Sequence, residues 1–210
     1  MSENHTRADK LIKSYSIISD QMDKKRLKVI LSQLEKVLLE KVEGSVVEFG
    51  CFAGTTSLFI RRLLDEIDST RDFHTYDSFE GLPQKSIEDA SVAGSDFKAG
   101  ELKATKHDFV RNFKKAGLKL PYIHKGWFSE LKPKELPEQI AFAFLDGDFY
   151  QSILDSLELV WPRMSAGGVV VVDDYMRSNL PGATRAVEEF FNSSRIKIRQ
   201  LSNLAIAIRH

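Results

Sequence analysis

Cysteine is nearly absent from this sequence, since Cys51 is the one cysteine among its 210 residues. No disulfide bond can therefore form within the chain, which is typical of proteins of a reducing compartment. An excess of one charge is also absent, because 30 lysines and arginines balance 30 aspartates and glutamates. A chain without net charge has no field to hold a phosphate backbone or an anionic membrane, so we expect neither nucleic acid nor membrane as a partner.

Long apolar runs are missing as well. No segment approaches the ~20 apolar residues that a helix needs to cross a bilayer, and the first residues, MSENHTRADK, lack the apolar core of a signal peptide. We therefore expect a soluble, cytoplasmic protein. Hydrophobic residues make up 42% of the sequence and charged residues 29%, which is typical of a globular chain, and 210 residues suffice for one α/β domain.

Apolar residues recur at helical spacing in some segments and in short buried runs in others. The pattern predicts strands over residues 45–50, 72–77, 121–126, 140–146, 167–174, 196–201 and 204–210. It predicts helices over residues 24–41, 55–67, 107–117, 149–164 and 183–193. Strands that alternate with helices indicate a doubly wound α/β fold with a mostly parallel, seven-stranded sheet. The tight connection before residue 204 makes the last strand antiparallel.

The predicted fold divides into an α/β domain over residues 44–210 and an N-terminal helical extension, or cap, over residues 1–43. The helix expected over residues 24–41 carries one apolar face. That face must pack against the sheet of its own chain or against a second subunit. The sequence leaves both alternatives open, and the second would make the protein a homo-oligomer.

Two glycines follow the first predicted strand, in the segment VVEFGCFAGTTS. Gly50 and Gly54 allow a tight turn and a close backbone approach to a ligand, and the next helix offers free N–H groups. The spacing differs from the Gly-x-Gly-x-x-Gly of dinucleotide oxidoreductases, which makes an NAD-linked enzyme a weaker alternative. Because Glu48 and Asp77 lie at the ends of the first two strands, we favour a nucleoside-binding site over a plain turn. Cys51 is expected to pack beneath the ligand.

Four aspartates lie at the ends of two later strands. Asp146 and Asp148 follow the fourth strand, and Asp173 and Asp174 end the fifth. If these strands are neighbours, the carboxylates converge, and like charges that close are costly unless a cation lies among them. Oxygen ligands without clustered histidine or cysteine indicate a hard ion, Mg²⁺ above all, with Mn²⁺ or Ca²⁺ as alternatives. We predict Asp146, Asp173 and Asp174 as metal ligands and assign Asp148 to the cap of the following helix.

Five segments of this sequence carry a resemblance to a known family. VEFGCFAGTTS, YDSFEGLP, KGWFSE, LDGDFYQS and GGVVVVDDY occur in the order seen in the macrocin O-methyltransferase family, which the sequence resembles over roughly residues 15–190. The resemblance implies a Rossmann-like class I methyltransferase fold. It also implies an enzyme that uses S-adenosylmethionine and Mg²⁺ to methylate a hydroxyl group of a small molecule, as the family does with sugars of macrolide antibiotics.

The resemblance further implies which residues form the site. The loop from Gly50 to Gly54 would hold the methionine moiety, Asp77 and its neighbours the adenosine, and Trp127 the region of the adenine unless it is a core aromatic residue. The expected cofactor residues are Glu48, Gly50, Phe52, Gly54, Thr55, Asp77, Ser78, Gly81 and Trp127. The expected Mg²⁺ ligands are Asp146, Asp173 and Asp174.

Methylation of a hydroxyl group requires a base, because an alcohol holds its proton tightly at neutral pH. Asp96 lies nearest to the acidic residue proposed as base in the family. Asp146 and His107 are substitutes, with His107 the least favoured. The polar segment over residues 84–99 is expected to close over the substrate and to exclude water.

Two alternatives keep the fold and change the function. Metal-dependent catechol methyltransferases have a similar set of acids, but they usually place a lysine after the fourth-strand acid, where this sequence has Phe149. A non-catalytic nucleoside-binding protein could also retain the fold, because function depends on the site and not on the fold.

Overall fold

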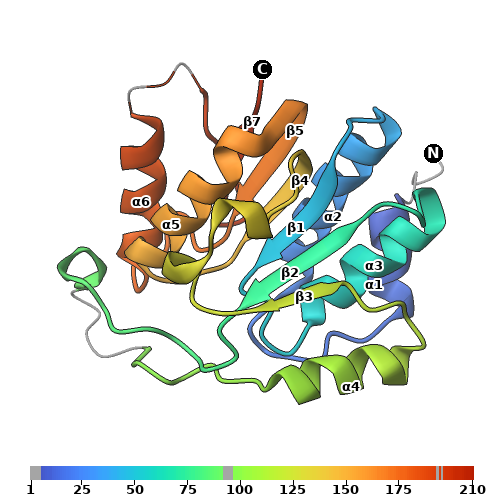
Figure 1. The fold of residues 1–210 in the computed structure, drawn as a ribbon, viewed down its shortest axis with the longest axis horizontal. Coiled ribbons are helices and arrows are strands. Elements are labelled where there is room, and N and C mark those ends of the chain that lie inside the picture. Colours follow the sequence, from blue (N-terminus) through green and yellow to red (C-terminus); the bar gives the residue numbers. More distant parts are fainter. Residues whose placement is uncertain (1–5, 92–96, 193, 195) are drawn as a thin grey trace.

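The computed structural model describes residues 6–91, 97–192, 194 and 196–210. Its centre is a seven-stranded sheet in the order β3-β2-β1-β4-β5-β7-β6, drawn in Figure 1. The strands are β1 (Ser45–Phe49), β2 (Phe73–Asp77), β3 (Tyr122–Lys125), β4 (Ile140–Leu145), β5 (Met164–Val172), β6 (Arg199–Leu201) and β7 (Leu204–Ile208). Strands β1 to β5 run parallel, and β7 is antiparallel to both β5 and β6. The predicted sheet, with its antiparallel end, is therefore confirmed.

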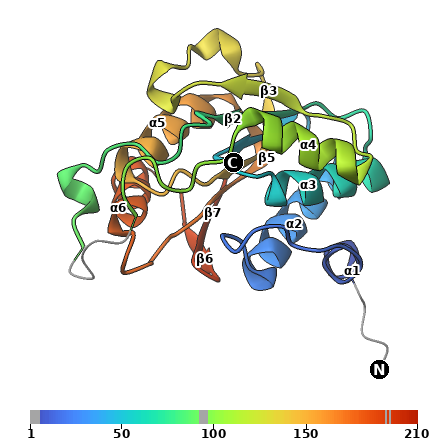
Figure 2. The same ribbon diagram turned by 90° about the horizontal axis from the view of Figure 1, so that it is seen from below.

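Helices cover both faces of the sheet, as Figure 2 shows. The apolar side chains of α1, α2 and α3 form one core layer with the sheet, those of α5 and α6 form the other, and α4 packs beside α3. The helices are α1 (Arg7–Ser14), α2 (Lys24–Leu39), α3 (Thr55–Ile67), α4 (Lys106–Ala116), α5 (Tyr150–Val160) and α6 (Pro181–Phe191). None of the described helices is both long and apolar enough to span a membrane.

Strand β4 shows why the central strands are apolar throughout. All of its residues are buried, and successive side chains of a strand point to opposite faces. Phe142 and Phe144 pack in the layer that contains α2 and α3, whereas Ala143 and Leu145 pack in the layer that contains α5 and α6. A parallel sheet with two covered faces needs this continuous apolar run rather than alternation of apolar and polar residues.

Helix α2 forms part of the core. Asp23 caps it by accepting hydrogen bonds from the backbone N–H groups of Lys25 and Arg26, at 2.7 and 3.0 Å. Its buried apolar side chains, which lie in one cluster with residues of β4, β5 and β7, are Leu27, Ile30, Leu31, Leu34, Val37 and Leu38. The apolar face of the N-terminal extension therefore covers the sheet of its own chain.

The centre of the sheet provides the place for a ligand. Strands β1 and β4 are neighbours, and the chain passes from β1 into α3 on one face and from β4 into α5 on the other. Connections that diverge in this way leave a crevice beyond the carboxyl ends of the strands, where ligands of open α/β sheets bind. The glycine loop and the strand-end aspartates all lie at this edge.

Candidate active site

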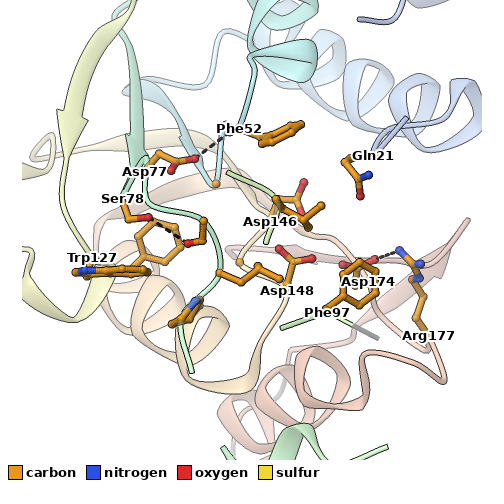
Figure 3. Close-up of a pocket in the computed structure, with 18 of the residues that line it drawn as sticks. Gln21, Phe52, Asp77, Ser78, Phe97, Trp127, Asp146, Asp148, Asp174 and Arg177 are labelled. Carbon is orange, nitrogen blue, oxygen red and sulfur yellow. Dashed lines mark hydrogen bonds and ion pairs between the residues drawn. The ribbon is translucent and has the colours of Figure 1, made fainter. Parts of the chain in front are cut away.

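A pocket opens beyond the carboxyl ends of β1, β2, β4 and β5 (Figure 3). The predicted site residues that line it are Gly50, Phe52, Asp77, Ser78, Gly81, Trp127, Asp146 and Asp174. A smaller pocket shares Gly50, Phe52 and Asp146 with the first, and is lined in addition by Glu48 and Thr55. The structure thus brings most of the residues predicted from the sequence to one place.

The glycine loop follows β1 and allows the close approach of two chain segments. A Cβ atom on Gly50 would lie 1.8 Å from the main-chain oxygen of Asp146, so no other residue fits there without a shift of the backbone. Gly54 has a φ of 92° and precedes the first turn of α3. Thr55 begins that turn, and its buried Oγ1 has no hydrogen-bond partner among the residues that the structure describes. The loop therefore offers backbone N–H groups and one free hydroxyl group to a ligand.

Asp77 connects the end of β2 to the glycine loop. Its Oδ2 accepts a hydrogen bond from the N–H of Phe52 at 2.9 Å, and its Oδ1 accepts one from the N–H of Phe79 at 2.7 Å. Burial raises the pKa of this carboxyl group despite these bonds. Asp77 is thus fixed at the pocket wall, and its contact with ribose hydroxyl groups stays a prediction.

Glu48 lies in the smaller pocket and is 1% exposed. The hydroxyl group of Ser57 donates a hydrogen bond to its Oε2. Burial, with a further contribution from the charge of Asp77, raises the pKa of Glu48 to about 8. Among the described residues no basic side chain forms an ion pair with Glu48, so a cationic ligand group would be stabilised beside it.

Ser78, Gly81 and Trp127 form the opposite wall. The Ser78 hydroxyl group donates to the main-chain oxygen of Gly81 at 3.3 Å, which closes the turn after β2. Gly81 has a φ of 86°, and a Cβ atom there would lie 2.5 Å from the main-chain oxygen of Glu101. Trp127 is partly exposed and lies against the pocket beside Ser78 (Figure 3). Trp127 is therefore not fully buried, and its place beside the adenine stays a prediction.

Three aspartates converge at the other end of the pocket, as Figure 3 shows. One carboxylate oxygen from each of Asp146, Asp148 and Asp174 lies within 4.8 Å of the others. Asp148 and Asp174 each have a φ of 58°, a backbone conformation that is strained for a residue other than glycine and is common at functional sites. The assignment of Asp148 as a helix cap is wrong, because Phe149 precedes α5 and the N–H of Tyr150 instead binds Asp89, at 2.7 Å.

Asp173 is not one of these three aspartates. Its Oδ2 accepts a hydrogen bond from Nη1 of Arg26 at 2.7 Å, and its Oδ1 accepts one from the N–H of Asp174 at 2.8 Å. Asp174 in turn pairs with Arg177, at 2.5 Å. Of the three predicted metal ligands, the structure places Asp146 and Asp174 together with Asp148, and it directs Asp173 to an arginine of α2.

The charges of this cluster oppose one another. Removal from bulk water, followed by the charge of Asp173, raises the pKa of Asp146 well above its usual range, and removal from water and the charge of Asp174 do the same for Asp148. Burial and Asp174 raise the pKa of Asp173 to about 7, although Arg26 acts in the opposite direction. Carboxylates that repel one another at this distance, without histidine or cysteine among them, fit the ligand set of a hard divalent cation.

The residues predicted as the general base, other than Asp146, are not placed at the pocket by the described part of the structure. Asp96 lies outside the described residues. His107 is exposed in the first turn of α4 and does not line the pocket. Within the segment predicted to close over the substrate, Asp89 is 3% exposed and binds the start of α5, while Phe97 lines the pocket. The closure itself stays a prediction.

Sequence reasoning missed several residues of the site, namely Gln21, Arg26, Phe97 and Arg177. Arg26 could have been noticed, because α2 begins with Lys24, Lys25 and Arg26 and has no acidic residue in its first turn. Positive charges are unfavourable at the N-terminus of a helix. A basic first turn therefore suggests that partners elsewhere in the fold offset its charge.

Comparison with known proteins points to one family. The profile of the family described as Macrocin-O-methyltransferase (TylF) matches residues 3–209. The chain is 33% identical over 172 residues to the 8-demethyl-8-(2,3-dimethoxy-alpha-L-rhamnosyl)-tetracenomycin-C 4'-O-methyltransferase of Streptomyces olivaceus, a match that covers 76% of this chain and 64% of that protein. It is 32% identical over 180 residues to the demethyldecarbamoylnovobiocin O-methyltransferase of Streptomyces niveus, with coverage of 79% and 65%. The chain thus spans slightly less than two thirds of the length of these relatives.

The fold agrees with this comparison. The solved structure of the O-methyltransferase NovP superposes with a TM-score of 0.75 at 28% sequence identity, and the superposition covers 89% of this chain and 80% of that chain. The class I methyltransferase fold expected from the sequence is therefore confirmed.

Proposed function

This chain belongs to the macrocin O-methyltransferase family, and from that premise we propose that it transfers the methyl group of S-adenosylmethionine to a hydroxyl group of a small molecule, a sugar or a glycoside. The relatives from Streptomyces are named as O-methyltransferases of a rhamnosyl-bearing tetracenomycin and of demethyldecarbamoylnovobiocin. The observation that carries the proposal is the position of three carboxylates, within 4.8 Å of one another, at the end of a pocket whose other end has the features of a nucleoside site.

The cofactor fits the pocket in one direction. The methionine moiety would lie by the smaller pocket, where the Glu48 carboxyl group has no counter-ion among the described residues and the Thr55 hydroxyl group has no partner. Its ammonium group would stabilise the carboxylate form of Glu48, and its carboxylate would accept a hydrogen bond from the Thr55 hydroxyl group. The ribose would bind Asp77, and the adenine would lie between Ser78 and Trp127. The sulfonium group would then lie between the glycine loop and Asp146.

A divalent cation, which we propose to be Mg²⁺, would be held by Asp146 and Asp174, with Asp148 as the third carboxylate in the arrangement observed here. Asp173, predicted as a ligand, would join this set by leaving Arg26. When bound, Mg²⁺ supplies positive charge that stabilises the alkoxide form of the acceptor.

The side chains of the pocket orient the acceptor and take up its proton. The acceptor oxygen forms a bond to the methyl carbon as the bond from that carbon to sulfur breaks, and S-adenosylhomocysteine remains. The hydroxyl proton passes to a carboxylate oxygen, for which we propose Asp96 or Asp146. Asp146 lines the pocket at the acceptor end, within reach of a bound hydroxyl group. Phe97 and Leu102 lie at the acceptor side and exclude water.

The test is the release of S-adenosylhomocysteine from S-adenosylmethionine in the presence of Mg²⁺ and a panel of nucleotide sugars, glycosides and catechols. We expect turnover with a sugar hydroxyl group and its loss when EDTA is added. Asp174→Asn should weaken Mg²⁺ binding at least tenfold while leaving S-adenosylhomocysteine binding within threefold, as measured by calorimetry. Turnover of catechols alone would support the aromatic alternative, and binding without turnover would support a nucleoside-binding protein.

The catechol alternative is disfavoured by one further observation. Phe149, which stands where catechol methyltransferases usually have a lysine, is 1% exposed and packs with Leu82 and Leu180. The side chain at this position therefore contributes to the core and brings no charge to the acceptor.

A further inference from the structure

Arg26 reaches the strand-end acids from the N-terminal part of the chain. Its side chain is 11% exposed, and Nη1 lies 2.7 Å from Oδ2 of Asp173 and 3.7 Å from Oδ1 of Asp174. Nε donates a hydrogen bond to Asp23 at 3.0 Å, and Nη2 donates one to the main-chain oxygen of Gln21. One guanidinium group thus connects the acids after β5 with the linker between α1 and α2.

This linker forms the wall of the site next to the glycine loop. Gln21 lines both pockets, and Ser19 and Met22 line the smaller one beside Glu48. Figure 3 shows the Gln21 side chain on the same side of the pocket as Asp146. The part of the chain that Arg26 holds is therefore the part that would contact the methionine moiety.

The electrostatic position of Arg26 indicates a role beyond the stability of α2. A positive charge in the first turn of a helix is unfavourable, and a buried guanidinium group is costly unless carboxylates surround it. Arg26 has such partners in Asp23, Asp173 and Asp174. It supplies to Asp173 and Asp174 positive charge of the kind that a metal ion would provide.

We propose that Arg26 is a positioning residue that holds the linker of residues 15–23 against the cofactor side of the pocket and competes with a divalent cation for the strand-end carboxylates. The inference rests on the proposed function for the identity of the two ligands. Arg26 acts through Asp173 and Gln21 and does not touch the reacting atoms. It makes metal binding weaker and cofactor binding stronger than they would be without it.

The two effects have opposite signs, and this makes the proposal testable. Removal of the guanidinium group leaves the acids with more negative charge and frees Asp173, so a divalent cation binds more tightly. The same change releases the main-chain oxygen of Gln21, so the linker loosens and the cofactor binds more weakly. A role in folding alone would weaken both ligands together.

The experiment is calorimetry on the full chain, with MgCl2 alone and with S-adenosylhomocysteine alone. Arg26→Met keeps the apolar stem of the side chain and removes the charge. We expect the Kd for Mg²⁺ to fall at least tenfold and the Kd for S-adenosylhomocysteine to rise about tenfold. The matched control is Arg7→Met, which removes an ion pair of 2.9 Å between Arg7 in α1 and Glu35 in α2, away from the pocket. It should leave both constants within threefold of the wild-type values.

Arg26→Lys keeps the charge but cannot bind Asp173 and Gln21 together, because its ammonium group lacks the fork of a guanidinium. This variant should bind Mg²⁺ within threefold of wild type and S-adenosylhomocysteine at least threefold more weakly, and it carries the test if Arg26→Met does not fold. Unchanged cofactor binding in a folded variant, or a loss of both ligands together, overturns the inference. A wild-type chain that binds neither ligand overturns the proposed function, and this inference with it.

Discussion

Glu48 illustrates how one buried group affects both stability and binding. Its carboxyl group is 1% exposed, its pKa is raised to about 8 by burial, and its hydrogen-bond donor is Ser57. The unfolded chain releases this proton near pH 4.5, whereas the folded chain keeps it to about pH 8. The folded state therefore binds more protons than the unfolded state between these values, and this group lowers stability as the pH rises through that window.

We predict that Glu48→Gln flattens this dependence. The amide has nearly the shape of the carboxyl group and stays neutral, so the variant should lose a slope of about 1.4 kcal/mol per pH unit between pH 5 and pH 8. Guanidinium chloride unfolding of the ligand-free protein, followed by circular dichroism, measures the slope. Exposed Glu66 in α3 provides the control, since Glu66→Gln should leave the slope unchanged. Equal slopes for wild type and Glu48→Gln would contradict the assignment.

The residues of the site could be predicted where their position follows from the strand order alone. Asp77, Asp146 and Asp174 end or follow parallel strands, and the carboxyl ends of such strands meet at one edge of the sheet. The side-chain directions could not be predicted. Asp173 turns to Arg26, which lies 147 residues away in the sequence, and no local pattern indicates that contact.

The spacing of apolar residues predicted the sheet and helices α2 to α6, but it did not predict helix α1 or where the elements end. The helix predicted to reach residue 164 ends at Val160, because Pro162 lies in the short 3-10 turn that follows. Strand β5 then begins at Met164, earlier than predicted. Helix α6 begins at Pro181, in keeping with the preference of proline for the first turn. The ends of these elements therefore depend on where prolines stand more than on the spacing of apolar residues.

The paired strands β2 and β3 also form a contact that the spacing of apolar residues along the sequence could not indicate. The ring nitrogens Nδ1 of His74 and Nε2 of His124 lie 3.1 Å apart, and the rings stack with Tyr122 and Tyr76. Burial, with a contribution from His124, lowers the pKa of His74 to about 4. Knowledge of the register between the strands is needed to foresee this stack.

We predict that these histidines make the protein sensitive to acid. Because the pKa of folded His74 lies below that of the unfolded residue, the unfolded state binds more protons between about pH 4 and pH 6.5, and stability falls as the pH drops through that range. His74→Phe keeps the stacking and cannot titrate, so its acid unfolding midpoint should move to lower pH. Acid titration followed by circular dichroism measures this midpoint. The exposed residue His107 is the control, and an equal shift in His107→Phe would contradict the explanation.

In the complete fold, the N-terminal extension belongs to the core that holds the site. Helix α2 buries six apolar side chains against the sheet, namely Leu27, Ile30, Leu31, Leu34, Val37 and Leu38. Each such side chain contributes roughly 1.5–3 kcal/mol, and their sum is comparable with the about 5–15 kcal/mol by which a typical protein is stable. The linker that follows α1 reaches the pocket, so the extension affects both folding and binding.

Division of the chain at residue 43 would remove α2 from the core. If α2 is part of the core, residues 44–210 alone should show no cooperative thermal transition, because removal of α2 exposes one face of β4 and β5 to water. A chain that lacks residues 1–14, and so keeps α2, should still unfold cooperatively at a lower temperature, since α1 contributes two buried residues, Ala8 and Leu11. Differential scanning calorimetry distinguishes these outcomes. A fragment of residues 44–210 that melts within a few degrees of the full chain would show that the extension is a separable cap, and would contradict the place of α2 in the core.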